Sequence, residues 1–284
     1  MRAWPGAALF VLCILILTGC GGPPPALEIG RSTDAPTVYR VSVGTESRFP
    51  GPVSDLEGGT DLTAAFEARP VSDSAVEVEI LYLAANIRDA EGEPVALDLG
   101  RLTGEKVEVV MGPPGEISEI RGDPALLEAS IPLIPLREVI ASLFPPLPQE
   151  ELREGDTWTG DVPIPFANLD GPPQRMRFLL DSINSSEGAA RIEGYELRTR
   201  PRSFTSETAS GGVSGEGDLD MVFDGRLRAG AGYEWTERTA EFDSQFIRLS
   251  GSGYANGSLR MESTTRVERL DSAEQFGLDS GTER

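Results

Sequence analysis

The stretch that decides the fold is VEVEILY, residues 76–82, in which apolar and acidic side chains alternate. A period of two is typical of a β-strand with one covered face, because successive side chains point to opposite sides of the strand. The covered face is expected to carry Val76, Val78, Ile80 and Tyr82. The stretch therefore predicts an antiparallel sheet with one apolar face and one polar face.

The same alternation recurs along most of the chain. Clusters of Gly, Pro, Asp and Ser separate the runs, which is typical of hairpins. The runs are Tyr39–Val43, Leu62–Phe66, Lys106–Met111, Met176–Leu180 and Leu219–Phe223, with further strands expected at Leu227–Glu241, Phe246–Ser250 and Leu259–Val267. The expected fold class is mainly β: a large curved antiparallel sheet, or two, with one short amphipathic helix.

The helix is expected at residues 135–144, PLREVIASLF. Its apolar residues have the i, i+3, i+4, i+7 spacing of a helix stripe. They are Leu136, Val139, Ile140 and Leu143. Pro135 suits the first helical turn, and Pro145–Pro146 end the helix. A helix this short is not stable alone, so we expect its stripe to dock on the concave face of the sheet.

Two pairs of segments indicate that the chain consists of two related halves. FEARPVSDSAVEVEILYL (66–83) aligns with FLLDSINSSEGAARIEGYEL (178–197), and GEKVEVVMGPPGEI (104–117) aligns with GEGDLDMVFDGRL (215–227) at nearly the same offset. Chance matching of amphipathic strands is the alternative. We expect a first β-rich half at 37–148, which includes the helix, a second at 149–270, and a frayed tail at 271–284.

Composition excludes several classes of function. The chain has 46 acidic and 25 basic residues, a net charge of −21, which argues against a nucleic-acid partner. It has no histidine, which excludes Ser-His-Asp and Cys-His catalysis and histidine-ligated metal sites. It also lacks GxSxG and SxxK motifs and a phosphate-binding glycine loop. A glycosidase carboxylate pair stays open, but nothing singles out two acids. We therefore expect no enzyme, no catalytic residue and no cofactor.

A cluster of aspartates is a candidate for a metal site. Asp218, Asp220 and Asp224 lie in GDLDMVFDG, where Asp224–Gly225 is a turn signal. Their spacing matches no calcium loop, and a solvated strand face explains them more simply. We expect no metal site.

The N-terminus, MRAWPGAALFVLCILILTGC, has the order of a secretory signal. Arg2 precedes an uncharged run, Ala7–Leu17, that is too short to span a bilayer. Leu17-Thr18-Gly19-Cys20 resembles the lipobox of bacterial lipoproteins. The resemblance implies a signal peptide at 1–19, a diacylglycerol on Cys20 and membrane attachment through this lipid; an ordinary signal peptide is the alternative.

The residues after Cys20 bear on location. Residues 20–36 are rich in Pro and Gly, which is typical of a tether. Gly21, rather than aspartate, favours the outer membrane facing the periplasm, by analogy with Gram-negative bacteria. We therefore expect a lipid-anchored protein of the bacterial cell envelope.

The segment LFPPLPQEELREGDTW, residues 143–158, resembles a group of uncharacterised envelope lipoproteins in which a Leu-Pro stretch precedes Gly-Asp-x-Trp. The group is similar in its strand and helix pattern to half-barrel lipoprotein carriers, which implies a curved sheet around a helix and an apolar cavity. The resemblance brings no catalytic residues. Trp158 either lines a ligand pocket or anchors a strand in the core, and we favour the second role.

The predicted function is non-catalytic binding of a lipid or other hydrophobic ligand on the concave face of the sheet. The candidate binding residues are Leu136, Val139, Ile140, Leu143 and Trp158. The alternative is a structural lipoprotein that docks another envelope protein and holds no small ligand.

Overall fold

The computed structural model describes most of the chain between Ala26 and Gln275. The described residues are 26–27, 35–50, 55–88, 93–112, 116–128, 130–131, 134–148, 151–197, 201–208, 211–249, 253–255, 257–272 and 275. The expected signal peptide, Cys20, and most of the expected tether and C-terminal tail lie outside them.

The N-terminal half forms a run of antiparallel strands. They are β2 (Thr37–Pro50), β3 (Asp55–Ser72), β4 (Ala75–Arg88), β5 (Pro94–Leu97), β6 (Lys106–Met111) and β7 (Ile117–Arg121), with the 3-10 helix η1 (Gly100–Leu102) before β6. The order in the sheet is β2-β3-β4-β6-β7, and β5 pairs with β4.

The C-terminal half forms a second run of antiparallel strands. They are β11 (Thr157–Val162), β12 (Gln174–Asn184), β13 (Ala189–Glu196), β14 (Arg202–Thr208), β15 (Gly211–Arg228), β16 (Gly232–Leu249), β17 (Gly253–Ala255) and β18 (Leu259–Leu270). The order is β11-β12-β13-β15-β16-β18, while β14 pairs with β15 and β17 with β16.

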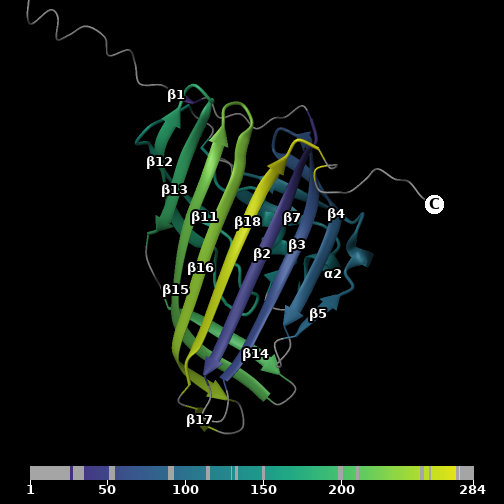
Figure 1. The fold of residues 1–284 in the computed structure, drawn as a ribbon, viewed down its shortest axis with the longest axis vertical. Coiled ribbons are helices and arrows are strands. Elements are labelled where there is room, and N and C mark those ends of the chain that lie inside the picture. Colours follow the sequence, from purple (N-terminus) through teal and green to yellow (C-terminus); the bar gives the residue numbers. More distant parts are fainter. Residues whose placement is uncertain are drawn as a thin grey trace, which may run out of the picture.

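One strand pair joins the halves into a single 14-stranded sheet (Figure 1). β18 pairs antiparallel with β2 from Leu270 opposite Val38 to Arg260 opposite Arg48. Within the described residues, no backbone pairing joins the two outer strands, β7 and β11, so the sheet is open. The expected large, curved antiparallel sheet is therefore confirmed.

The segments that align in the sequence occupy matching positions in the sheet. Residues 66–83 span the β3–β4 hairpin, and residues 178–197 span the β12–β13 hairpin. The next strand in the sheet is β6 in the first half and β15 in the second, the two strands of the other aligned pair. The aligned segments thus occupy corresponding places in the pairing order, and the relationship of the two halves stays a prediction.

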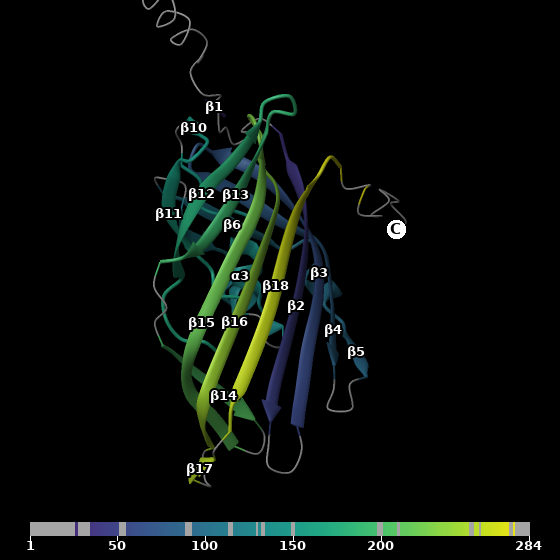
Figure 2. The ribbon, with the colours of Figure 1, turned by 60° about the vertical axis from the view of Figure 1, so that its left-hand side comes forward.

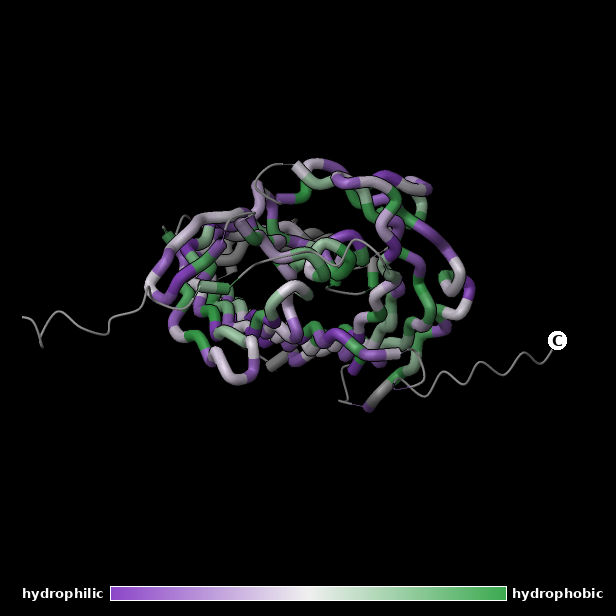
Figure 3. Tube along the Cα trace, turned by 90° about the horizontal axis from the view of Figure 1, so that it is seen from above, coloured by the Kyte–Doolittle hydropathy of each residue, from purple (hydrophilic) through white to green (hydrophobic). Residues whose placement is uncertain are grey.

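The chain between the halves fills the concave side of the sheet, and we call its described residues from Asp123 to Leu147 the plug. It contains α2 (Pro124–Leu127), β8 (Ser130–Ile131), β9 (Ile134–Pro135) and α3 (Leu136–Ala141). Beyond it, β10 (Leu152–Arg153) pairs with β1 (Ala26–Leu27). Figure 2 shows α3 behind the long strands, and Figure 3 shows hydrophobic segments enclosed by the sheet.

Helix α3 is shorter than the predicted 135–144. Its last regular residue is Ala141, and the backbone N–H groups of Leu143 and Phe144 bond to the carbonyls three residues earlier. This tighter final turn precedes Pro145, before which a helical conformation is sterically disfavoured. The short helix α2, which no periodicity predicted, is capped by the Asp123 carboxylate, 2.8 Å from the backbone nitrogen of Ala125.

The interior holds two hydrophobic clusters. The N-terminal cluster joins the inner faces of β2, β3, β4, β6 and β7 with α2 and α3, and it contains all four residues of the predicted helix stripe. The C-terminal cluster joins the inner faces of β12, β13, β15, β16 and β18 with Leu27, Leu147 and Leu152. The expectation that the stripe docks on the concave face is confirmed.

Three local expectations were wrong. Tyr82 is 37% exposed rather than inward, because a register shift opposite Ala65 and Phe66 leaves Leu81 without a partner and reverses the alternation. The expected strand Leu227–Glu241 is divided by a turn between Arg228 and Gly232. Asp224–Gly225 lies within β15 and makes no turn.

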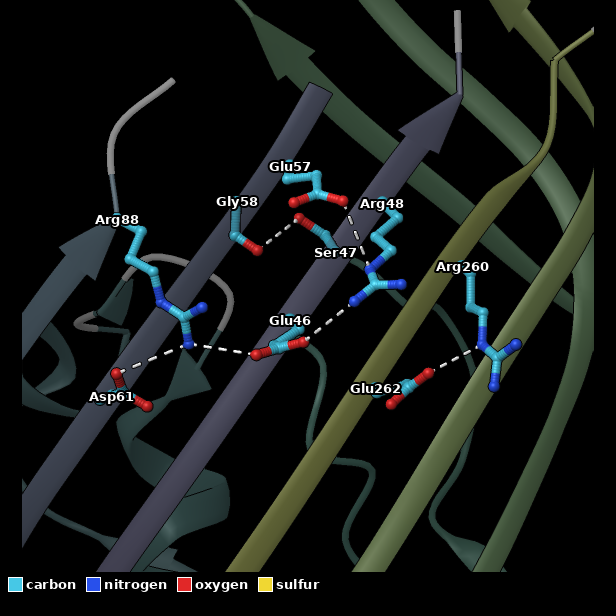
Figure 4. A network of polar contacts seen from close by, with 9 residues as sticks. All are labelled: Glu46, Ser47, Arg48, Glu57, Gly58, Asp61, Arg88, Arg260 and Glu262. Atoms are coloured by element: carbon cyan, nitrogen blue, oxygen red, sulfur yellow. Dashed lines mark hydrogen bonds and ion pairs between the residues drawn. The ribbon is translucent and has the colours of Figure 1, made fainter. Parts of the chain in front are cut away.

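The outer face of the central strands carries alternating charges (Figure 4). Arg88 lies 3.1 Å from Glu46 and 3.8 Å from Asp61, and Arg260 lies 2.8 Å from Glu262. Exposed pairs of this kind each contribute about 0–1 kcal/mol. Their consequence is a hydrated outer face, opposite the apolar inner face of the sheet.

The contact between the plug and β11 can be tested at Gly160. A Cβ atom at this position would overlap the ring of Pro146. We expect Gly160→Ala to lower the free energy of unfolding by about 1–3 kcal/mol, measured by urea denaturation. Gly44→Ala is the matched control, since its Cβ would meet only Asp61 Oδ1 at an ordinary 3.5 Å. Equal stability of the two variants would contradict the packing.

Candidate ligand-binding cleft

A small cleft lies where the plug crosses from one hydrophobic cluster to the other. Leu143 belongs to the N-terminal cluster and Leu147 to the C-terminal cluster. Beside this crossing is a cavity of about 70 Å³. Its lining residues are Ala35, Thr37, Tyr39, Ala68, Pro70, Val76, Leu143, Phe144, Pro145, Leu147, Ala231, Gly232 and Tyr233.

The cleft is chemically suited to an apolar group. None of its lining side chains carries a charge. Tyr39 and Phe144 meet edge to face, with ring centroids 6.5 Å apart. Carbon surface with a few hydroxyl groups at the margin is the usual lining of a small-molecule site. The arrangement offers burial of hydrocarbon and no reactive group.

The wall formed by the plug is held by side chains of the C-terminal half. The Trp158 Nε1–H donates to the carbonyl of Pro146 over 3.1 Å, and the Tyr233 hydroxyl reaches the same oxygen at 3.5 Å. Trp158 also stacks on Phe178, with centroids 5.5 Å apart. Two donors on one carbonyl fix the segment just after α3, so Trp158 positions the cleft without lining it.

The predicted binding residues fall into three places. Leu143 lines the cleft. Leu136, Val139 and Ile140 are buried against the sheet below it and do not line it. Trp158 lies behind the wall, and Cys20 is outside the described residues.

Sequence reasoning missed a polar seam that separates the two clusters. Its residues point inward from the central strands and are almost fully buried: Thr45, Thr236, Arg238, Ser263 and Thr265. The hydroxyls of Thr45 and Ser263 are 3.4 Å apart. Arg238 is 5% exposed and donates to the carbonyl of Pro163 over 2.7 Å and to Thr265 Oγ1 over 3.2 Å. Counting by twos from Ala240 and Phe242 would have placed Arg238 inside.

Arg238 and Glu138 bring opposite charges into the interior. Burial lowers the pKa of Arg238 to about 10, and the attraction of Glu138 opposes this change. Burial raises the pKa of Glu138, opposed by Arg238 and Arg137. Arg238 is therefore still protonated at neutral pH, and it holds the loop between β11 and β12 through Pro163.

A larger hollow of about 670 Å³ lies on the C-terminal half, and its lining includes the charged residues Asp161, Arg175 and Arg202. There, Arg175 of β12 contacts Asp161 of β11 at 3.1 Å. It also contacts Glu116, the residue before β7, at 2.8 Å, and this second contact bridges the two edges of the open sheet. Arg202 donates to the Pro172 carbonyl and to Gln174 Oε1, both at 2.8 Å. These arginines are engaged by the protein itself, so the hollow offers less to a hydrophobic ligand than the cleft.

The aspartates considered for calcium do not converge. Asp218 and Asp220 are exposed on β15, while Asp224 lies 3.1 Å from Arg191. Within the described part of the chain, no group of three or more acidic or cysteine side chains could hold a metal ion. The solvated strand face is the arrangement observed.

The role of Trp158 as a positioning residue can be tested by Trp158→Phe. This variant retains an aromatic ring against Phe178 and loses the donor to Pro146. We expect it to lose about 1 kcal/mol of unfolding free energy in urea. The control is Trp235→Phe, because Trp235 contacts Arg266 through its ring at 5.8 Å. A smaller loss at Trp158 than at Trp235 would contradict the assignment.

A buried carboxyl group predicts a pH effect on stability. Among the described residues, neither carboxyl oxygen of Glu196 has a hydrogen-bond partner. Burial, reinforced by the charge of Asp220, raises the pKa of Glu196 from 4.5 to about 7. The folded chain therefore holds this proton to higher pH than the unfolded chain, and stability falls as pH rises from 4.5 through about 7.

The variant Glu196→Gln removes that titration. We expect its unfolding free energy to exceed that of the wild type by an amount that grows with pH up to about 7. The gain at neutral pH should be about 1 kcal/mol, reduced by the partial access of water to the group. Urea titrations at several pH values measure it, and a difference independent of pH would refute the raised pKa of Glu196 as its cause.

Comparison with known proteins identifies no family. No protein-family model and no curated protein matches the sequence. Solved structures give weak likenesses. They are DynF from the dynemicin biosynthesis pathway of Micromonospora chersina (9% identity, 90% of this chain and 89% of that chain, TM-score 0.25), OmpF of Salmonella typhi in complex with daunomycin (6%, 86% and 100%, 0.19) and an outer membrane channel from Pseudomonas putida F1 (8%, 88% and 99%, 0.18). Scores this low carry no argument about function.

Among the described residues, no helix is long and apolar enough to cross a membrane.

Proposed function

We propose that this chain is a non-catalytic protein of the bacterial cell envelope, anchored by a lipid on Cys20, that binds the apolar part of a lipid or similar ligand. The observation that carries the proposal is the uncharged cleft between the plug and the ends of β2, β3, β4 and β16. The lipobox resemblance at Leu17–Cys20 supports the anchor.

The size of the cleft limits how the ligand binds. Pockets that enclose a whole small molecule measure about 300–1,000 Å³, whereas this cleft measures about 70 Å³. A longer ligand therefore requires the segment from Leu143 to Leu147 to move aside. Leu143 and Phe144, before the two prolines, and Leu147, after them, line the cleft, whereas α3 contributes no side chain to it. We propose that this segment moves when the hydrogen bonds of Trp158 and Tyr233 to the Pro146 carbonyl open, while α3 remains docked.

Docking of another envelope protein is less well supported. Tyr195 and Val222 are 45% and 62% exposed and lie opposite each other on the outer face of β13 and β15. Docking surfaces are marked by apolar patches of several hundred Å². Two neighbouring side chains fall short of that, so ligand binding is the function we propose.

Ligand binding can be tested with the chain from residue 21 to 284, which contains every described residue. We expect native mass spectrometry to show a lipid-sized adduct that solvent extraction releases. We also expect dansylated undecanoic acid to bind with a rise in fluorescence. Absence of both signals from the folded protein would refute ligand binding.

A variant that fills the cleft tests whether the ligand binds at this place. Ala68 is buried and lines the cleft. Ala68→Leu adds three carbon atoms there, and we expect it to weaken binding of dansylated undecanoic acid about tenfold, a loss of about 1.4 kcal/mol. Ala96→Leu, the same substitution at an exposed position of β5, should leave the affinity unchanged. Equal affinities of the two variants would place the ligand elsewhere.

A further inference from the structure

Part of the expected tether is folded against the domain. Ala26 and Leu27 of β1 pair antiparallel with Arg153 and Leu152 of β10. The Leu27 side chain is 4% exposed and packs in the C-terminal hydrophobic cluster. Backbone pairing and a buried side chain together clamp the N-terminal segment well before β2 begins.

The clamp shortens the chain between Cys20 and the domain. Ala26 is the sixth residue after Cys20, and six peptide units span at most about 20 Å. A tether running freely from Cys20 to Thr37 would reach about 60 Å. A lipid on Cys20 therefore holds the β1–β10 pair close to the bilayer, at about a third of the distance that the free tether would allow.

The cleft opens at the same end of the sheet. Its lining includes Thr37 and Tyr39 at the start of β2 and Gly232 and Tyr233 at the start of β16. In Figures 1 and 2, β1 lies at the end of the molecule from which β2 and β16 start. The clamp and the cleft are thus on the side of the domain that the anchor draws toward the membrane.

Resting on the anchor and the ligand site of the proposed function, we infer that the β1–β10 clamp presents the cleft to the bilayer and that the occupant is an acyl chain of a phospholipid in that same bilayer. The lining fits this occupant because it is uncharged. Its volume of about 70 Å³ admits the end of one chain and excludes a charged headgroup, whose burial without a partner is costly.

The test uses the lipidated chain in vesicles of phosphatidylethanolamine and phosphatidylglycerol that contain a phospholipid with a diazirine at the end of one acyl chain. Illumination links the diazirine to its neighbours, and mass spectrometry measures the yield on peptides with Tyr39 and Phe144. One variant carries a Gly-Ser insert of about twelve residues between Gly22 and Pro23. Its matched control carries the same insert between Arg31 and Ser32, after the clamp.

We expect cross-links at the cleft in the wild type. Lengthening the chain before the clamp should lower the yield about fivefold, because the effective concentration falls with roughly the −3/2 power of linker length. The control insert should leave the yield unchanged. Equal yields in all three proteins, or equal losses from both inserts, would overturn the role of the clamp.

A second readout separates this inference from the function on which it rests. If no protein cross-links at the cleft while dansylated undecanoic acid still binds, the ligand comes from a source other than the bilayer and the inference is wrong. If neither probe binds, the proposed function itself fails.

Discussion

The pairing of β2 with β18 is the constraint on which the rest of the structure depends. It joins the first long strand of the chain to the last, from Val38 opposite Leu270 to Arg48 opposite Arg260. Without it, each half would expose another unpaired strand edge, which invites aggregation. With it, the two inner faces form one concave surface deep enough to cover a connecting segment that has too little structure to be stable alone.

The interior is divided rather than continuous, and this division places the cleft. Buried polar side chains such as Arg238 and Thr265 lie between the two hydrophobic clusters. The plug must cross from one cluster to the other, and it does so at two prolines that cannot continue α3. Trp158 and Tyr233 fix the crossing through one carbonyl, that of Pro146. Imperfect packing at this crossing leaves the apolar space.

The candidate site was only partly predictable. The helical spacing identified Leu143, which lines the cleft, together with three neighbours that fill the core instead. Tyr39, Ala68 and Tyr233 come from strands far apart in the chain, and no local pattern brings them together. Arg238 was missed because a charged side chain is not expected on a buried face, although it shares its side of β16 with Ala240 and Phe242. The folded part of the tether, Ala26–Leu27, carries no signal of its own, since two residues show no period.

The sequence by itself determined the class of structure. Alternation such as VEVEILY specifies strands with one apolar face, the stripe around Ile140 specifies a docked helix, and the absence of histidine removes whole classes of chemistry. Only the tertiary structure decided that the two halves share one sheet, that a bulge turns Tyr82 outward, and that the plug ends beside a cleft. The reason is physical: side-chain periodicity is a local property of the backbone, whereas strand partners, bulges and residual space depend on packing between distant segments.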